Sequence, residues 1–338
     1  MKIYTYSNPF KLKEEEYWAE ISNAPNLCVS QTLVQGLTTS GRNKYCREDY
    51  GFIYTIKDFN EKLYKDWLKN PENDIEQFLN LSKEIAKIEN VNLKNTFKFN
   101  QRDLYNAIRL LIELNIKPWE IKRGYSLEID EFINIYEKLY STDSWSVLNN
   151  LKIDERKIKD SFIDLLSEEI KDREKETRIE NTVNHLKNYK KNIGVIDKIV
   201  IHGVHRFEPM IIRLINDLDK LGIEVIFLIN YIPEFERVYE TWRRVYLWTG
   251  TELIHGKNHY PSNKGNLGEA MGFLLEGEFI DYNADNIQCI KFYNLTSFSD
   301  YVSNIYAETI NEEKKFNKSH RINKMREQFY AVDRSEEH

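Results

Sequence analysis

The chain has 338 residues, of which 41% are hydrophobic and 30% are charged. These values are ordinary for a globular protein and exclude a disordered chain, a collagen and a short disulfide scaffold. The length allows two or three domains. The net charge of −6 excludes a chain that is basic throughout, so a site for a polyanion such as DNA must be a local patch.

Cysteine usage and hydropathy indicate the compartment. Cys28, Cys46 and Cys289 are scattered and form no C-x-x-C pair, which predicts free thiols in a reducing compartment. The N-terminus has no apolar signal-peptide segment. The longest apolar run, at 223–232, is interrupted by polar residues and is too short to cross a bilayer. We therefore expect a cytoplasmic protein without membrane contact.

The first 55 residues have an α/β pattern. Lys2–Tyr6 and Leu27–Val34 are rich in apolar and β-branched residues, so both are predicted to be strands. A helix is predicted between them, over Glu14–Ile21. The sequence GLTTSGRN at 36–43 is predicted to be a loop by its Gly, Ser and Thr content.

Residues 56–190 differ from the N-terminal segment. Apolar side chains recur there at the i, i+3, i+4 spacing of amphipathic helices, with dense Lys and Glu between them. Because no long strand signal interrupts the pattern, we predict a large all-helical insertion.

The segment at 195–231 predicts the fold class. Lys198–Gly203 and Ile223–Ile229 are apolar enough to be buried strands, and Phe207–Leu221 between them has one apolar helical face. Gly222 follows where a glycine commonly ends a helix. A strand–helix–strand unit of this length makes the two strands parallel. The predicted fold is therefore α/β with a parallel sheet that carries the helical insertion.

The C-terminal part is predicted to contain a helix over Glu234–Trp248, loops with a short helix over 249–288, a strand over Ile290–Tyr293 and a helix over Phe298–Glu313. The first of these helices has an aromatic stripe, which we interpret as core, with base stacking as the alternative. The stripe consists of Phe235, Tyr239, Trp242 and Tyr246.

A degenerate phosphate-loop motif follows the second predicted strand. It consists of Gly36, Gly41, Arg42 and Asn43, whereas a working loop has the form G-x-x-x-x-G-K-[ST]. Arg42 could still bind phosphate, but Asn43 is a poor replacement for the hydroxyl that holds Mg²⁺. The glycine spacing also arises by chance in a chain of this composition, so a plain loop is the competing interpretation.

No catalytic constellation is visible in the sequence. A P-loop hydrolase needs carboxylates at the end of the strand that stops at Ile201, to hold Mg²⁺ and orient water. His202 and Gly203 follow instead, and the nearest acids, Asp197 and Glu208, lie outside the strand end. The motifs G-x-S-x-G and H-E-x-x-H are also absent, and neither Glu14–Glu16 nor Glu224 fits the D…[DE]-x-K pattern of a nuclease. We predict no catalytic residues and no cofactor.

Histidines raise the question of a metal. Four of the seven have H-x₂-H and H-x₃-H spacings that zinc sites can use: His202, His205, His255 and His259. Residues three apart on a strand point to opposite faces, however, and no cysteine lies near them. We therefore predict packing and capping histidines and no metal site.

Basic residues are concentrated in three segments that could contact the phosphates of a nucleic acid. The alternative for each is a solvated helix end. The candidate residues are Lys187, Lys190 and Lys191; Arg243 and Arg244; and Lys314, Lys315, Arg321 and Lys324.

Residues 198–242 resemble superfamily 1 helicase-like domains that have lost their ATPase motifs, in particular the B subunits of ATP-dependent helicase/nuclease complexes that process double-strand breaks. The resemblance is carried by IHGVHRFEP at 201–209, an apolar strand that ends in Gly and is followed by an aromatic residue and a Phe-x-Pro step. The sequence FYNLTSFSDYVSNIY at 292–306 is similar to the strand-to-helix segment that follows in such proteins.

The resemblance implies a P-loop-like, helicase-like fold in three parts. Residues 1–55 and 191–338 would form the two parts of the α/β domain, and 56–190 the helical insertion. The family's second motor-like domain and its nuclease domain have no counterpart in this sequence, so the second part is expected to be truncated on its C-terminal side.

The leading hypothesis is a non-catalytic, helicase-like protein that binds DNA or acts as a scaffold. It would work with a helicase or nuclease subunit in DNA repair or in defence against phage and other foreign DNA. One alternative is a nucleotide-binding enzyme with an altered Walker A loop, for which ATP and Mg²⁺ would be the ligands. The other is a protein–protein adaptor without a ligand.

Overall fold

A computed structural model describes residues 1–7, 9–38, 49–175, 180–247, 250–257 and 294–316. The chain divides into two compact units. The first contains the described residues up to 257, and the second contains the described residues from 294 onwards. Each unit is described by itself.

A six-stranded sheet forms the centre of the first unit, and all of its described strand pairs are parallel. The strand order is β3-β2-β4-β5-β1-β6. The strands are β1 (Lys2–Tyr6), β2 (Asn26–Cys28), β3 (Ile53–Thr55), β4 (Lys198–His202), β5 (Glu224–Asn230) and β6 (Leu253–His255). The predicted strand–helix–strand unit is confirmed, since helix α12 (Pro209–Lys220) connects the neighbouring strands β4 and β5. The α/β class is therefore confirmed.

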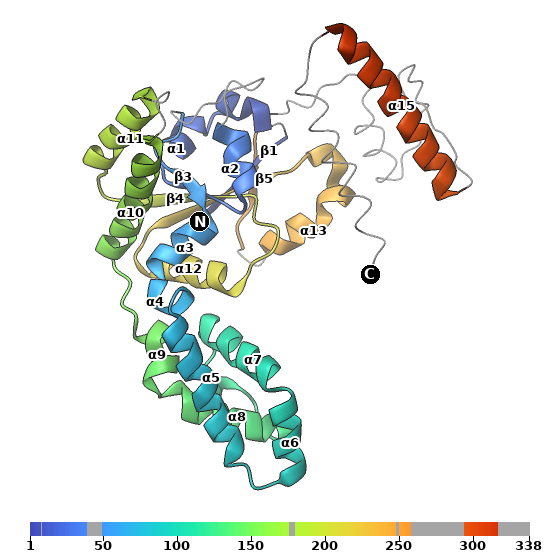
Figure 1. The fold of residues 1–338 in the computed structure, drawn as a ribbon. Helices are drawn as coiled ribbons and strands as arrows, with labels where there is room; N and C mark the ends of the chain where they lie inside the picture. The colour runs from blue at the N-terminus through green and yellow to red at the C-terminus, as the bar shows by residue number, and fades with distance from the viewer. Residues whose placement is uncertain (8, 39–48, 176–179, 248–249, 258–293, 317–338) are drawn as a thin grey trace. The chain divides into compact units, whose positions relative to one another are not determined.

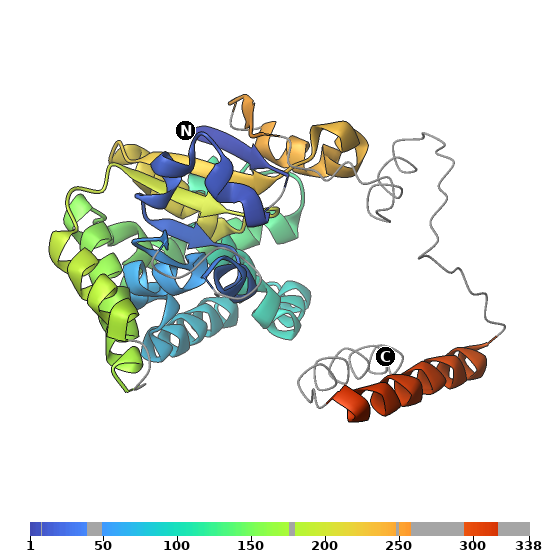
Figure 2. The same cartoon turned by 90° about the horizontal axis from the view of Figure 1, so that it is seen from above.

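Helices cover both faces of the sheet (Figure 1; Figure 2). Alternate strand residues point to opposite faces, so Ile201 and Phe227 belong to one core cluster while Val200 and Ile226 belong to another. Helices α1 (Trp18–Ser22) and α2 (Gln31–Thr38) lie on one face, and α3 (Ile56–Leu63) and α12 lie on the other. The arrangement is a three-layer α/β/α structure.

The segment between β3 and β4 is helical throughout its described part, as the sequence predicts. After α3 it consists of α4 (Lys65–Leu68), α5 (Pro71–Ala86), α6 (Val91–Phe99), α7 (Gln101–Glu113), the 3₁₀ turn η3 (Pro118–Glu120), α8 (Leu127–Tyr140), α9 (Asp143–Asn150), α10 (Glu155–Arg173) and α11 (Glu180–Asn192). The side chains of Asn70, Asn90, Ser126 and Asp154 cap the helices that follow them, which satisfies backbone N–H groups that have no partner inside the helix.

Helices α10 and α11 lie beside the β3 edge of the sheet (Figure 1; Figure 2). The ring of Phe162 in α10 lies with its centroid 4.4 Å from both Phe52 and Phe59. The Tyr54 hydroxyl also donates a hydrogen bond to Glu169. The helical segment is thus joined to the sheet by a continuous core, to which both contribute.

Two predictions for the N-terminal segment are wrong in their bounds. The predicted strand over Leu27–Val34 ends at Cys28, and α2 begins at Gln31. The Ser30 hydroxyl accepts a hydrogen bond from the Leu33 N–H, and this cap starts a helix inside a β-branched run. The predicted helix over Glu14–Ile21 is also divided, into the 3₁₀ turn η1 (Pro9–Glu14) and the short α1.

In the C-terminal part, the helix predictions agree with the structure, whereas the strand β6 was not predicted. Helix α13 (Glu236–Leu247), preceded by the 3₁₀ turn η4 (Pro233–Phe235), and helix α15 (Leu295–Phe316) are found where they were predicted. Strand β6, however, lies in a stretch predicted to be loop. The predicted strand at 290–293 lies outside the described residues. Among the described helices, none is both long enough and apolar enough to span a bilayer.

Candidate functional site

In parallel α/β sheets, ligands bind outside the carboxyl ends of the strands, where the connections from two neighbouring strands diverge. Here that point lies between β2 and β4, because the connection from β2 leads to β3 on one side and the connection from β4 leads to β5 on the other. The predicted phosphate loop follows β2, one of these two strands. Gly36 lies within helix α2 rather than in a loop, and Gly41, Arg42 and Asn43 lie outside the described residues.

One amide side chain joins the carboxyl ends of β1 and β5. Asn230, at the end of β5, donates hydrogen bonds of 3.2 Å from Nδ2 to the carbonyl oxygens of Tyr6 and Ser7. Its Oδ1 accepts a hydrogen bond of 3.1 Å from the Tyr239 hydroxyl. The chain leaving β1 thus presents carbonyl oxygens to Asn230, and these groups would repel a phosphate.

The end of β4 is closed by a buried pair. His202 and Asn26 are both 0% exposed, and His202 Nε2 lies 2.6 Å from Asn26 Oδ1. Asn26 Nδ2 already donates to the carbonyl oxygens of Ile21 and Ala24, so Oδ1 is the acceptor and His202 Nε2 carries the proton. Burial lowers the pKa of His202 to about 3. A neutral imidazole therefore occupies the end of β4.

A third group of contacts joins β1 to β6. Thr5 Oγ1 and His255 Nδ1 lie 3.1 Å apart, and the Tyr17 hydroxyl donates to the Thr5 carbonyl oxygen over 2.7 Å. Glu15 Oε2 accepts a hydrogen bond of 2.7 Å from the Lys257 N–H. These side chains hold the edge strand in place, and within the described residues they form no cluster of metal ligands.

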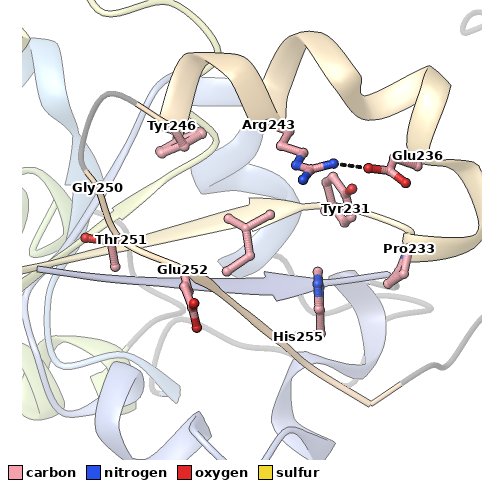
Figure 3. Close-up of a pocket in the computed structure, with 10 residues that line it drawn as sticks. Tyr231, Pro233, Glu236, Arg243, Tyr246, Gly250, Thr251, Glu252 and His255 are labelled. Atoms are coloured by element: carbon pink, nitrogen blue, oxygen red, sulfur yellow. Dashed lines mark hydrogen bonds and ion pairs between the residues drawn. The ribbon is translucent and has the colours of Figure 1, made fainter.

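A pocket of about 570 Å³ lies between α13 and β6 (Figure 3). Its one guanidinium is already engaged, since Arg243 forms an ion pair with Glu236. The Tyr246 hydroxyl, in the same pocket, bonds to the Val204 carbonyl oxygen. The described lining residues are Tyr231, Pro233, Glu236, Arg243, Tyr246, Gly250, Thr251, Glu252, Leu253 and His255. With two carboxyl groups and one guanidinium in its described lining, the pocket is not suited to a polyanion.

The aromatic stripe of α13 is core, as predicted. Phe235 and Tyr246 are buried, and Tyr239 and Trp242 are partly buried against the main hydrophobic cluster. Base stacking on this stripe is therefore excluded for the two buried rings. Of the remaining predicted histidines, His205 lies beside Trp242 with ring centroids 5.5 Å apart, and position 259 lies outside the described residues.

Most of the predicted basic residues are engaged or not described. Arg244 pairs with Glu240 over 2.5 Å, as Arg243 does with Glu236, and Lys190 donates to Ser167 Oγ over 2.7 Å. For two further candidates, Lys314 and Lys315, the structure does not describe the side chains. Arg321 and Lys324 lie outside the described residues.

Lys187 and Lys191 remain, and the structure brings them together. Both line a shallow hollow of about 480 Å³ on the exposed face of α11. The described lining consists of Asn184, His185, Lys187, Asn188 and Lys191, with no carboxyl group. Lys187 does pair with Glu174 over 2.5 Å, but both side chains are about half exposed, at 52% and 46%, so the pair is weak. In the part of the chain that the structure describes, Lys191 forms no ion pair.

Sequence reasoning found these lysines but missed Asn26 and Asn230. Both are single polar residues beside an apolar strand, and only the backbone they contact shows what they do. Cys28, predicted to be a free thiol, is free and buried, and burial raises its pKa.

No protein-family model and no curated protein sequence matches the chain.

Proposed function

We propose that this chain is a non-catalytic, helicase-like protein that binds the phosphate backbone of nucleic acid through the exposed face of α11. The observation that carries the proposal is the α11 hollow, whose described lining offers hydrogen-bond donors and cations but no carboxyl group. Residues 181–196 contain no Asp or Glu, although acidic residues outnumber basic ones in the whole chain. The local field at α11 therefore favours a polyanion.

The chemistry of the hollow fits a backbone contact. Lysine ammonium groups bind phosphate as point charges, and asparagine amides add hydrogen bonds to phosphate oxygens. None of these groups is held in a rigid geometry that would read base edges, so binding is expected to be independent of sequence. Two lysine–phosphate contacts on a duplex correspond to a salt slope of about −1.8.

The polar contacts at the sheet edge support the non-catalytic part of the proposal. Asn230 bonds to the backbone of the chain leaving β1 and His202 bonds to Asn26, and neither of them is a carboxylate that could hold Mg²⁺ as in a nucleotide hydrolase. A protein of this kind contributes binding rather than chemistry. We therefore propose that it acts beside a motor or nuclease subunit, in DNA repair or in defence against foreign DNA.

Fluorescence anisotropy with labelled single- and double-stranded oligonucleotides of equal length tests the proposal. We expect salt-sensitive binding of both at 50 mM salt, and a roughly 10-fold or greater loss in the double variant Lys187→Glu/Lys191→Glu, because two phosphate contacts become repulsive. The matched control is Lys57→Glu/Lys152→Glu, which makes the same charge change at two exposed lysines away from α11. It should reduce binding much less.

Two results would contradict the proposal. One is equal binding by the α11 variant and its charge-matched control, which would mean that only net charge matters. The other is a clear rise in melting temperature on addition of ATP and Mg²⁺, removed by Arg42→Ala, which would favour the nucleotide-binding enzyme.

A further inference from the structure

A second surface with the chemistry of a nucleic-acid site lies on α6 and the start of α7. Two rows of side chains run along it at the i, i+4 spacing that places helical residues side by side. We call this surface the α6 ridge. One row consists of Val91, Asn95 and Phe99, all exposed, and the adjacent row consists of Lys94 and Lys98. Arg102 follows at the start of α7, which is separated from α6 by Asn100.

Phe99 is the most exposed large hydrophobic residue in the described part of the chain, at 91%. Its neighbour Phe97 faces the other way and is buried at 5% exposure, so α6 already has an aromatic anchor in the core. Phe99 thus contributes little to packing within the chain. An aromatic ring that lies free on a helix surface is available to stack on another flat, partly apolar group.

The cations beside Phe99 are free of carboxyl partners. Residues 90–102 contain three basic residues and no Asp or Glu, and within the described residues Lys94, Lys98 and Arg102 form no ion pair. The guanidinium of Arg102 lies 5.4 Å from the centre of the Tyr105 ring, which leaves its N–H groups available. Acids begin only outside the run, at Glu89 and Asp103.

Another exposed aromatic surface, around Trp119 and Tyr125, lacks this charge pattern. It also carries basic residues, with Lys117 and Lys122 beside the two rings, but Arg123 there pairs with Glu137 over 2.9 Å. The helix that follows begins with further acids in its first turn. Of the two exposed aromatic surfaces, the α6 ridge is therefore the one complementary to a polyanion.

We infer that the α6 ridge binds single-stranded nucleic acid, with a base stacked on Phe99 and the adjoining phosphates at Lys94, Lys98 and Arg102. A ring of this kind cannot reach the stacked face of a base inside a duplex, whereas the bases of a single strand are accessible. The inference deepens the proposed function and rests on it. The α11 face would contact the backbone of either form, and the α6 ridge would add a preference for single strands.

Anisotropy with a single-stranded oligonucleotide and the matching duplex tests the inference. In Phe99→Ala we expect about a 10-fold loss of affinity for the single strand and no change for the duplex, because stacking on one base is removed. The salt slope should stay as in the wild type. Phe99→Trp keeps an aromatic ring at this position and should bind the single strand like the wild type. The control is Leu127→Ala, which removes another exposed apolar side chain, 74% exposed in the structure, and should have no effect on binding.

The charged row is tested with Lys94→Gln/Lys98→Gln. We expect this variant to lower the salt slope for the single strand by about 1.4, because two phosphate contacts are lost. Unchanged single-strand binding in Phe99→Ala would overturn the inference. If a co-purifying protein were lost from that variant instead, the ridge would be assigned to a protein partner.

The inference and the proposed function fail separately. If Lys187→Glu/Lys191→Glu weakens duplex binding while Phe99→Ala changes nothing, the proposed function stands and the ridge does not. If Phe99→Ala weakens single-strand binding while the α11 variant binds like its charge-matched control, the α11 assignment fails alone.

Discussion

The carboxyl edge of the sheet and the outer surface of the helical segment use their polar side chains in opposite ways. At the edge, His202 bonds to Asn26 of the neighbouring strand and Asn230 bonds to the backbone. On the helical surface, Lys98 and Lys191 face solvent with no ion pair among the described residues. In many parallel α/β proteins the edge binds the ligand and the helices support it. Here the edge is structural, and the available binding chemistry lies on helices.

The largest effect on stability is expected from removing the amide at the buried edge. Asn26→Ala leaves the His202 N–H and the carbonyl oxygens of Ile21 and Ala24 without partners. Each unpaired buried group costs about 1–3 kcal/mol, so the free energy of unfolding should fall by about 4 kcal/mol in urea titrations. The control, Asn23→Ala, removes an exposed amide bonded to the Ala19 carbonyl oxygen and should cost under about 1 kcal/mol. Similar losses of unfolding free energy in the two variants would show that the buried Asn26 amide stabilises the fold no more than an exposed amide does.

The second effect concerns pH and the same buried pair. The unfolded chain takes up a proton on His202 as pH falls through about 6.5, whereas the folded chain does so only near its pKa of about 3. The stability associated with the neutral ring is therefore complete above pH 7.5 and is lost as pH falls from 6.5 towards 3. At about 1.4 kcal/mol per pH unit, the loss between pH 7.5 and 4.5 is about 2.7 kcal/mol.

His202→Gln isolates this contribution, because the glutamine amide can donate to Asn26 but does not titrate. Urea titrations of both proteins at pH 7.5 and 4.5 give the measurement, and the wild type should lose more stability than the variant. Equal losses would mean that the ring is accessible to protons.

A smaller effect is expected at the carboxyl ends of β1 and β5. Asn230→Ala removes the two hydrogen bonds to the chain leaving β1 and the bond from Tyr239. Because Asn230 is only half-buried and water can partly replace it, we expect a loss of about 2 kcal/mol in the free energy of unfolding. Hydrogen exchange at Tyr231, whose N–H bonds to the Tyr6 carbonyl oxygen, should become faster. Unchanged protection there would contradict the role of Asn230 in joining the two strand ends.

The smallest effect is expected on the helical surface. Phe99→Ala should change the free energy of unfolding by no more than about 0.5 kcal/mol, as for other exposed substitutions. By comparison, truncation of the buried Phe97 should cost about 3–5 kcal/mol. A large loss of unfolding free energy in Phe99→Ala would show that Phe99 stabilises the fold, and would contradict its assignment to binding.

Hydrophobic pattern was enough to predict the parallel pair β4–β5 and the helical segment, because long buried runs and amphipathic faces are local properties of the chain. It was insufficient for β3 and β6, each three residues long, because so short a strand is defined by its neighbours in the sheet. Leu27–Val34 failed for a different reason, since one cap at Ser30 outweighed the strand preference of the residues after it.

For the candidate site, sequence identified the basic composition at 187–191 but not which lysines share a face. Helical geometry turns Lys190 towards Ser167 and leaves Lys187 and Lys191 together. The acid-free run at 90–102 was equally visible in the sequence. What could not be read from it was the exposure of Phe99 beside a buried Phe97, because a helical stretch with two phenylalanines does not show which one enters the core.

The position of β1 between β5 and β6 also has a consequence for synthesis. Tyr6 and its partner Asn230 are separated by 224 residues, so β1 must wait until that much more of the chain has been synthesised before it can pair with β5. At about 5–20 residues per second, that wait is on the order of 10–50 s. The helical segment can meanwhile fold through local contacts, whereas β1 stays unpaired and requires protection from other nascent chains. The sheet therefore cannot be completed until the helical segment and β5 have been synthesised.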